Sequence, residues 1–222
     1  MINHRLLGYI LIFLTFPTWA VQNRYSFWSL MSVSGTIGSY SYDIQSQLRF
    51  NEHGTPIDQF LTNVSAGHSL AAQWAAWIGT TYVLNDLDAL KNLKEIRLWE
   101  QLNWIYSQNP ETLRINSRLE QRTASHYSGI ANRLRERLII SFPLESKWRA
   151  VSYDEIFINF NRVSWITTKT LDQNRLYIGL EHKTSNVWQF GLGYIYQYVF
   201  SSPAQSNNIL QASLFLNLDH FG

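Results

Sequence analysis

The sequence predicts an all-β protein, an antiparallel up-and-down transmembrane β-barrel of about ten strands, with twelve strands as the alternative. Three observations predict this class: long segments that alternate polar and apolar residues, an apolar N-terminal segment of the kind that directs export, and many aromatic residues near the segment ends. The 222 residues are enough for one domain. We therefore expect a signal peptide at 1–20 and an outer-membrane barrel at 21–222.

Alternation is the most informative of the three observations. In residues 113–123, Leu113 and Leu119 fall on one face of an extended chain, and Arg114 and Arg118 fall on the other. A transmembrane strand needs about 9–11 residues, whereas soluble strands average about five or six. Segments of the longer kind lie at 40–51, 60–70, 73–84, 93–106, 113–124, 130–142, 148–160, 173–184, 187–200 and 207–219.

The connections between these segments alternate in length. Short ones lie at 71–72, 107–110, 143–147 and 184–186, and longer ones at 52–59, 85–92, 125–129, 161–172 and 201–206. Outer-membrane barrels have short turns at the periplasmic rim and longer loops at the other rim. Ten strands would place both ends of the barrel at the short-turn rim.

Residues 24–37 complicate the strand count, because Tyr25, Phe27 and Trp28 are also typical of a strand. An eleventh strand would break the up-and-down parity. We therefore expect this segment either to pack at or inside the lumen, or to contain two short strands that would make the barrel twelve-stranded.

The first twenty residues resemble a secretory signal peptide. Arg5 lies in a short basic region, residues 6–16 are apolar, and Ala20 precedes a plausible cleavage site. An N-terminal membrane anchor is the alternative. No other stretch approaches the roughly 18 apolar residues of a membrane-spanning helix, which excludes a helical membrane protein.

The aromatic residues help to separate a membrane barrel from a soluble one. Nine Trp, 12 Tyr and 12 Phe often lie near the ends of the alternating segments, where interfacial girdles occur. A soluble β-sandwich or a lipocalin-like cup would also alternate, but with its apolar face inside. Strand length, aromatic position and the signal peptide favour the membrane barrel, and so does Phe221 near the C-terminus.

Four short motifs resemble an uncharacterised family of bacterial outer-membrane β-barrel proteins, a domain family of unknown function. They lie, in this order, at 95–101 (EIRLWEQ), 118–122 (RLEQR), 133–135 (RLR) and 153–157 (YDEIF). The resemblance covers nearly the whole chain from about Trp28. It implies a barrel and an outer-membrane location, and no catalytic residues. The family is also distantly similar to the acidic-oligosaccharide porins, which are twelve-stranded. Because that similarity concerns the architecture alone, a transport function for this chain is an analogy.

If the apolar face contacts lipid, the polar face lines an interior rich in arginine. The residues that we expect there, and that could bind anions, are Arg97, Arg114, Arg118, Arg122, Arg133, Arg135, Arg137, Glu95, Glu120 and Glu155. Arg49, Arg175, Lys183, Asp43 and Glu181 belong to the same face.

Two interpretations of this inner face stay open. Carboxylates could pair with arginines of adjacent strands and simply fill a narrow barrel. Alternatively, the surplus of arginine could make a wet lining that favours anionic solutes.

Composition excludes several classes of function and of binding site. The net charge of +2 is too small to indicate nucleic-acid binding, and the absence of Cys excludes disulfides and thiolate metal sites. We find no metal-ligand spacing or cofactor fingerprint and expect neither. The partners that we expect are outer-membrane lipid and small anionic solutes, with the protein itself a monomer.

Two further functions are weaker alternatives. Ser128 could be the nucleophile of a lipid-modifying hydrolase, with His126 as its base and Glu136 as the third member. The barrel lipid A deacylases carry a similar pair, but near the C-terminus. The residues otherwise favour a protein that is not an enzyme. A passive structural or adhesive barrel could instead present loop 161–172 to a partner.

Overall fold

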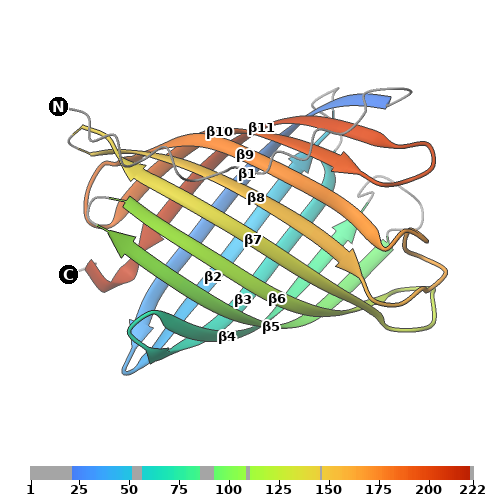
Figure 1. Ribbon diagram of the computed structural model, residues 1–222, viewed down its shortest axis with the longest axis horizontal. Coiled ribbons are helices and arrows are strands. Elements are labelled where there is room, and N and C mark those ends of the chain that lie inside the picture. Colours follow the sequence, from blue (N-terminus) through green and yellow to red (C-terminus); the bar gives the residue numbers. More distant parts are fainter. Residues whose placement is uncertain (1–21, 52–56, 86–92, 109–110, 146, 221–222) are drawn as a thin grey trace.

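The computed structural model describes residues 22–51, 57–85, 93–108, 111–145 and 147–220, in which eleven strands form one closed barrel (Figure 1). Each strand pairs with its neighbours in sequence, and β1 closes the barrel against β11. The strands are β1 Gln22–Ile37, β2 Tyr40–Phe50, β3 Ile57–Ala71, β4 Trp74–Asn85, β5 Leu93–Gln108, β6 Glu111–Ala124, β7 Ala131–Pro143, β8 Trp148–Asn159, β9 Leu171–Lys183, β10 Trp188–Val199 and β11 Gln205–Asn217. This architecture confirms the predicted fold class.

The two faces of the sheet are as the alternation predicts. Large apolar side chains point outward and are exposed on the isolated chain; Leu98 and Ile178, for example, are 58% and 65% exposed. Their neighbours along the strands point inward, and Trp99 and Tyr177 are only 2% and 4% exposed. The barrel is therefore apolar outside and polar or aromatic inside, the reverse of a soluble cup.

Strand β1 corrects the expectation for residues 24–37. The segment neither packs in the interior nor splits into two short strands, and it forms one strand of 16 residues. It pairs antiparallel with β2 and parallel with β11, with Gln22 opposite Gln205 and Ser34 opposite Asn217. A parallel closing pair removes the parity requirement, and the strand count falls between the two that we expected.

Parallel closure also separates the two ends of the barrel. The ends of β1, β3, β5, β7 and β9, which the short connections follow, lie at one rim with the end of β11. The ends of β2, β4, β6, β8 and β10, which the longer connections follow, lie at the other rim with the start of β1. In Figure 1 β1 accordingly begins at the right and β11 ends at the left. The expectation that both ends lie at the short-turn rim was wrong, because it assumed an even number of strands.

The only helix in the described ranges is a short 3-10 helix, Leu218–His220, after β11. No helix in these ranges is long and apolar enough to cross a bilayer. The predicted signal peptide, residues 1–20, lies outside the described residues. The first described strand begins at Gln22.

Candidate interior anion site

The inward side chains enclose a cavity of about 580 Å³. Strands from all sides of the barrel contribute to its lining. Its arginines are Arg49, Arg97, Arg114, Arg118, Arg135, Arg137, Arg149 and Arg175, and its acids are Asp43 and Glu181. A cavity with this lining is strongly cationic, and its volume lies within the range of about 300–1,000 Å³ that small-molecule sites occupy.

An ion-pair network forms the floor of the cavity. It begins on β5, where the Glu95 carboxylate accepts hydrogen bonds from Arg97 Nε at 2.8 Å and from Arg122 Nε at 2.5 Å. Arg122 lies on β6, and its position opposite Arg97 in the register brings both guanidinium groups to one carboxylate. Glu95 is 4% exposed, so this pair of contacts is largely excluded from water.

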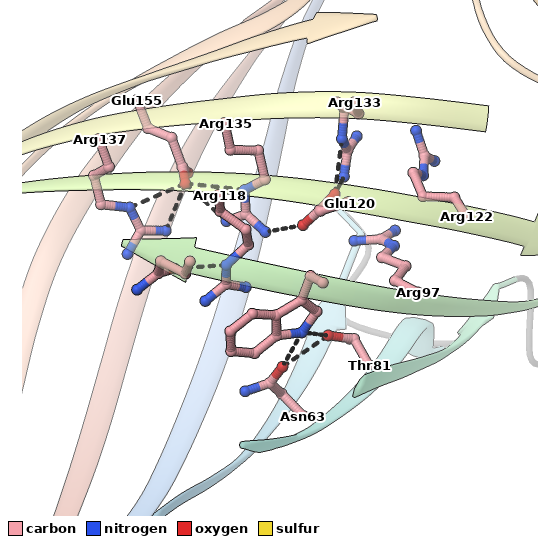
Figure 2. Close-up of polar contacts among 12 residues, drawn as sticks. Asn63, Thr81, Arg97, Arg118, Glu120, Arg122, Arg133, Arg135, Arg137 and Glu155 are labelled. Atoms are coloured by element: carbon pink, nitrogen blue, oxygen red, sulfur yellow. Dashed lines mark hydrogen bonds and ion pairs between the residues drawn. The ribbon is translucent and has the colours of Figure 1, made fainter. Parts of the chain in front are cut away.

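The network continues from β6 to β7 through Glu120, which is fully buried (Figure 2). Arg133 donates from Nε and Nη2 to Glu120 Oε2 at 2.9 and 2.6 Å, and Arg135 Nη1 donates to Glu120 Oε1 at 2.7 Å. Arg133 also donates to Asp172 at 3.0 Å. The two arginines point to the same carboxylate because they are neighbours on the inner face of one strand.

Glu155 on β8 links this network to the cavity wall (Figure 2). Arg135 Nη2 lies 2.7 Å from Glu155 Oε1, and Arg137 Nη2 lies 2.8 Å from the same oxygen. Arg175 Nη1 lies 3.8 Å from Oε2. Several cations therefore share one buried carboxylate, and the rings of Phe157 and Trp28 lie beneath their guanidinium groups.

Beyond the network, towards the long connections, the interior is packed. Val83, Ala131, Ile195 and Ile209 point inward there and are fully buried. Trp165, from the connection 160–170, lies 5.2 Å from the Arg122 guanidinium. We call this region, together with the ion-pair network at its border, the packed half, and the region of the cavity, towards the short turns, the open half. A second hollow beside the short turns shares Arg149, Glu181 and Gln189 with the cavity, so the open half continues to the short-turn rim.

Three arginines of the cavity differ from those of the network. Among the described residues, no carboxylate pairs with Arg49, Arg114 or Arg118. Arg114 is exposed to the open half and makes no hydrogen bond to a described residue. We call these three the unpaired arginines, and they are the part of the interior that can accept an anion without first breaking an ion pair.

Two of the unpaired arginines lie flat on tryptophan rings. The Arg49 guanidinium carbon is 3.8 Å from the ring centroid of Trp28, and that of Arg118 is 3.7 Å from the ring centroid of Trp99. Trp99 is fixed in turn, because its Nε1 lies 3.1 Å from both Asn63 Oδ1 and Thr81 Oγ1. The guanidinium planes are therefore held in position without neutralising their charge.

Sequence reasoning named ten residues for this interior, and the structure places all ten on the inner face of the barrel. Eight of them, Arg137 included through its ion pair with Glu155, belong to the network described above, and Arg114 and Arg118 do not. Sequence reasoning missed the two tryptophan supports and Arg149, which lies 3.2 Å from Glu181. The alternation of β8 could have found Arg149, because it shares a face with Glu155.

The structure does not bring the hydrolase candidates together. His126 and Ser128 are exposed in the connection 125–130, where His126 adopts a φ of 68°. Glu136 points outward from β7 and accepts a hydrogen bond from Ser117 at 2.7 Å. No hydrogen bond links these three candidates in the described chain, and no group of three or more His, Asp or Glu side chains there could hold a metal ion.

Comparisons with known proteins agree with this architecture. A solved structure of the NanC porin matches with a TM-score of 0.53 and 12% identity, over 79% of this chain and 86% of that one. An uncharacterised protein of Methylorubrum extorquens is 26% identical over 196 residues, 85% of this chain and 86% of its own length. Residues 25–208 match the family described as "Protein of unknown function (DUF2490)". The chain therefore belongs to this family, whose barrel fold resembles that of a porin.

Proposed function

We propose that the protein is an integral outer-membrane β-barrel that acts as a narrow channel for small anionic solutes. The proposed location rests on the apolar outer face, the porin-like fold and the predicted signal peptide. A barrel with polar side chains inside and apolar side chains outside is stable only when its outer surface is covered by hydrocarbon or detergent.

One observation carries the proposed selectivity: the unpaired arginines lie in a cavity that already holds more cations than acids. A buried cation without a partner is costly, so these side chains require water or an anion beside them. Rings of arginine or lysine are the linings that select anions in protein pores. The ion-pair network and the packed half would then form the constriction of the channel.

A scaffold without transport is the competing interpretation, because the ion pairs of the packed half fill the barrel without any ligand. Planar-bilayer recording of the refolded protein under a salt gradient separates the two. We expect small conductance steps and a reversal potential on the anion-selective side. Cation selectivity, or a correctly folded barrel that carries no current, would contradict the proposed channel. Folding is checked by heat-modifiable migration of the unboiled protein.

A further inference from the structure

We infer that the floor of the cavity is a two-point binding site for an elongated small molecule with an anionic oxygen group, carboxylate or phosphate, at each end. Arg49 and Arg118 are the two binding points. The inference rests on the proposed function, since it places a defined site inside the channel, but it makes a separate claim about equilibrium binding.

The first point is Arg118 on β6. Its Nε donates to Gln101 Oε1 at 2.6 Å, and its guanidinium lies on Trp99. Both terminal nitrogens of Arg118 are without a bond to any described residue. A guanidinium held at one edge and covered on one face presents its remaining N–H pair as a fork, the geometry that binds a carboxylate or phosphate in a bidentate way.

The second point is Arg49 on β2, which has the same construction. Its Nε donates to Gln47 Oε1 at 2.8 Å, its Nη1 donates to Gln59 Oε1 at 2.5 Å, and its guanidinium lies on Trp28. Neutral amides fix Arg49, as Gln101 fixes Arg118, so both side chains are oriented although neither forms an ion pair with a described carboxylate. Preorganised groups of this kind lose little conformational entropy when a ligand binds.

The wall between the two points explains why the site needs two anionic groups. Strands β3, β4 and β5 separate β2 from β6, so the two arginines project from different sides of the cavity. The cationic neighbours between them, Arg97 and Arg135, are already bonded to Glu95, Glu120 and Glu155. A ligand with one charge could satisfy one point only, whereas a ligand charged at both ends could satisfy both.

The mouth of the cavity fits the same ligand. Arg114, the third unpaired arginine, lies on β6 nearer the short turns than Arg118 and is exposed to the open half. A cation there would draw anions towards the floor, because a low-dielectric wall focuses its field. An elongated ligand would enter from the short-turn rim, since the packed half narrows the described interior on the other side.

Isothermal titration of the refolded full-length barrel in detergent at low salt tests the site. The probes are α,ω-dicarboxylates of increasing length, from glutarate to suberate, with the monocarboxylates of equal length for comparison. We expect saturable binding that is strongest at one chain length, and roughly tenfold or more tighter than that of the matched monocarboxylate. α,ω-Alkanediphosphonates of the same chain lengths form the phosphate arm. Tighter binding of one of them than of every dicarboxylate would identify phosphate oxygens as the preferred group, with the two-point site retained.

Four variants locate the binding. Arg49→Gln and Arg118→Gln should each reduce dicarboxylate affinity to that of the monocarboxylate, whereas Arg162→Gln, an exposed arginine of the connection 160–170, should leave it unchanged. Arg118→Lys keeps the charge but loses the fork, so it should bind more weakly than the wild type and more tightly than Arg118→Gln. This order would not follow from a purely structural role.

Equal affinity for monocarboxylates and dicarboxylates at every length, or the absence of saturable binding, would overturn the two-point site. Equal losses in all variants including Arg162→Gln would overturn it as well. These results are distinguishable from a failure of the channel. Saturable binding without conductance would retain the site and reject transport, whereas anion-selective current without saturable binding would retain transport and reject the site.

Discussion

Both the packed half and the open half of the barrel contain inward-pointing arginines, which are paired with carboxylates in the packed half and include unpaired ones in the open half. In the packed half, Arg133 is 3% exposed and bonds to two carboxylates. In the open half, Arg114 faces the cavity and has no carboxylate partner in the described chain. The difference arises from the acids, because Glu95, Glu120 and Glu155 all lie at or beyond the floor of the cavity.

This contrast indicates what each half does. A charge that is buried without a partner costs several kcal/mol, so arginines can be excluded from water only where carboxylates accompany them. Where carboxylates are too few to pair with every arginine, the remaining arginines require a hydrated space, and that space is the cavity. In the proposed channel, the ion pairs would narrow one half of the barrel, and the unpaired arginines would keep the other half open to anions.

The largest effect is expected from removing the central carboxylate of the packed half. Glu120→Gln keeps the shape of the side chain but removes one of the two carboxylate partners of Arg133 and one of the two of Arg135, which leaves the buried cluster with an excess of positive charge. It should lower the free energy of unfolding by about 3–5 kcal/mol. Urea unfolding in lipid vesicles, followed by tryptophan fluorescence, measures the change. The matched variant Glu145→Gln, in an exposed short turn, should stay within about 0.5 kcal/mol of the wild type. Equal stability of the two variants would remove the energetic distinction between the halves.

A smaller effect is expected from disturbing the support of Arg118. A Cβ at Gly79 would lie 2.3 Å from the Trp99 ring, so Gly79→Ala must displace the indole and should cost about 1–3 kcal/mol. The same variant should weaken dicarboxylate binding. Gly191→Ala is the control, because its Cβ would meet its nearest neighbour, in Ser213, at 3.4 Å. Unfolding curves and titrations that do not separate the two alanine variants would show that Trp99 does not hold the arginine.

The smallest change in stability is expected at the mouth of the open half. Arg114→Gln removes no ion pair to a described residue, so the free energy of unfolding should change by no more than about 0.5 kcal/mol. Its effect should appear in the bilayer instead, as a reversal potential that moves towards zero selectivity. A loss of stability comparable to that of Glu120→Gln would mean that Arg114 has a structural partner after all.

Much of the fold could be predicted from alternation together with the positions of the turns, because period-two patterns of about ten residues recur along the chain, as in residues 113–123. Strand β1 could not be assigned in this way. Its inner face carries Trp28 and Leu30 as well as serines, and its outer face carries Ser29 beside Phe27 and Met31, so neither face is distinctly polar. Closure by a parallel pair is a property of the whole barrel that no local pattern contains.

The candidate site could be predicted only in part, for a related reason. Alternation places Arg118 and Arg135 on the inner face, but only the register shows that Arg135 reaches two carboxylates whereas Arg118 reaches none. The tryptophan supports were missed because an aromatic residue among polar inner residues has no distinctive spacing. The division into two halves depends on where acids from different strands meet, which is a three-dimensional property.

The central claim is that the open half is wide, wet and cationic, that the packed half is a constriction too narrow for reagents larger than a small ion, and that the outer face contacts hydrocarbon. The chain contains no cysteine, so single cysteines can report on each region in vesicles. Ser141→Cys samples the cavity lining, Ala131→Cys the packed half and Leu98→Cys the outer face. We predict that a water-soluble anionic thiosulfonate modifies only Ser141→Cys, and that a bilayer-soluble maleimide modifies Leu98→Cys. Rapid reaction of the anionic reagent with Leu98→Cys, together with protection of Ser141→Cys, would contradict the account.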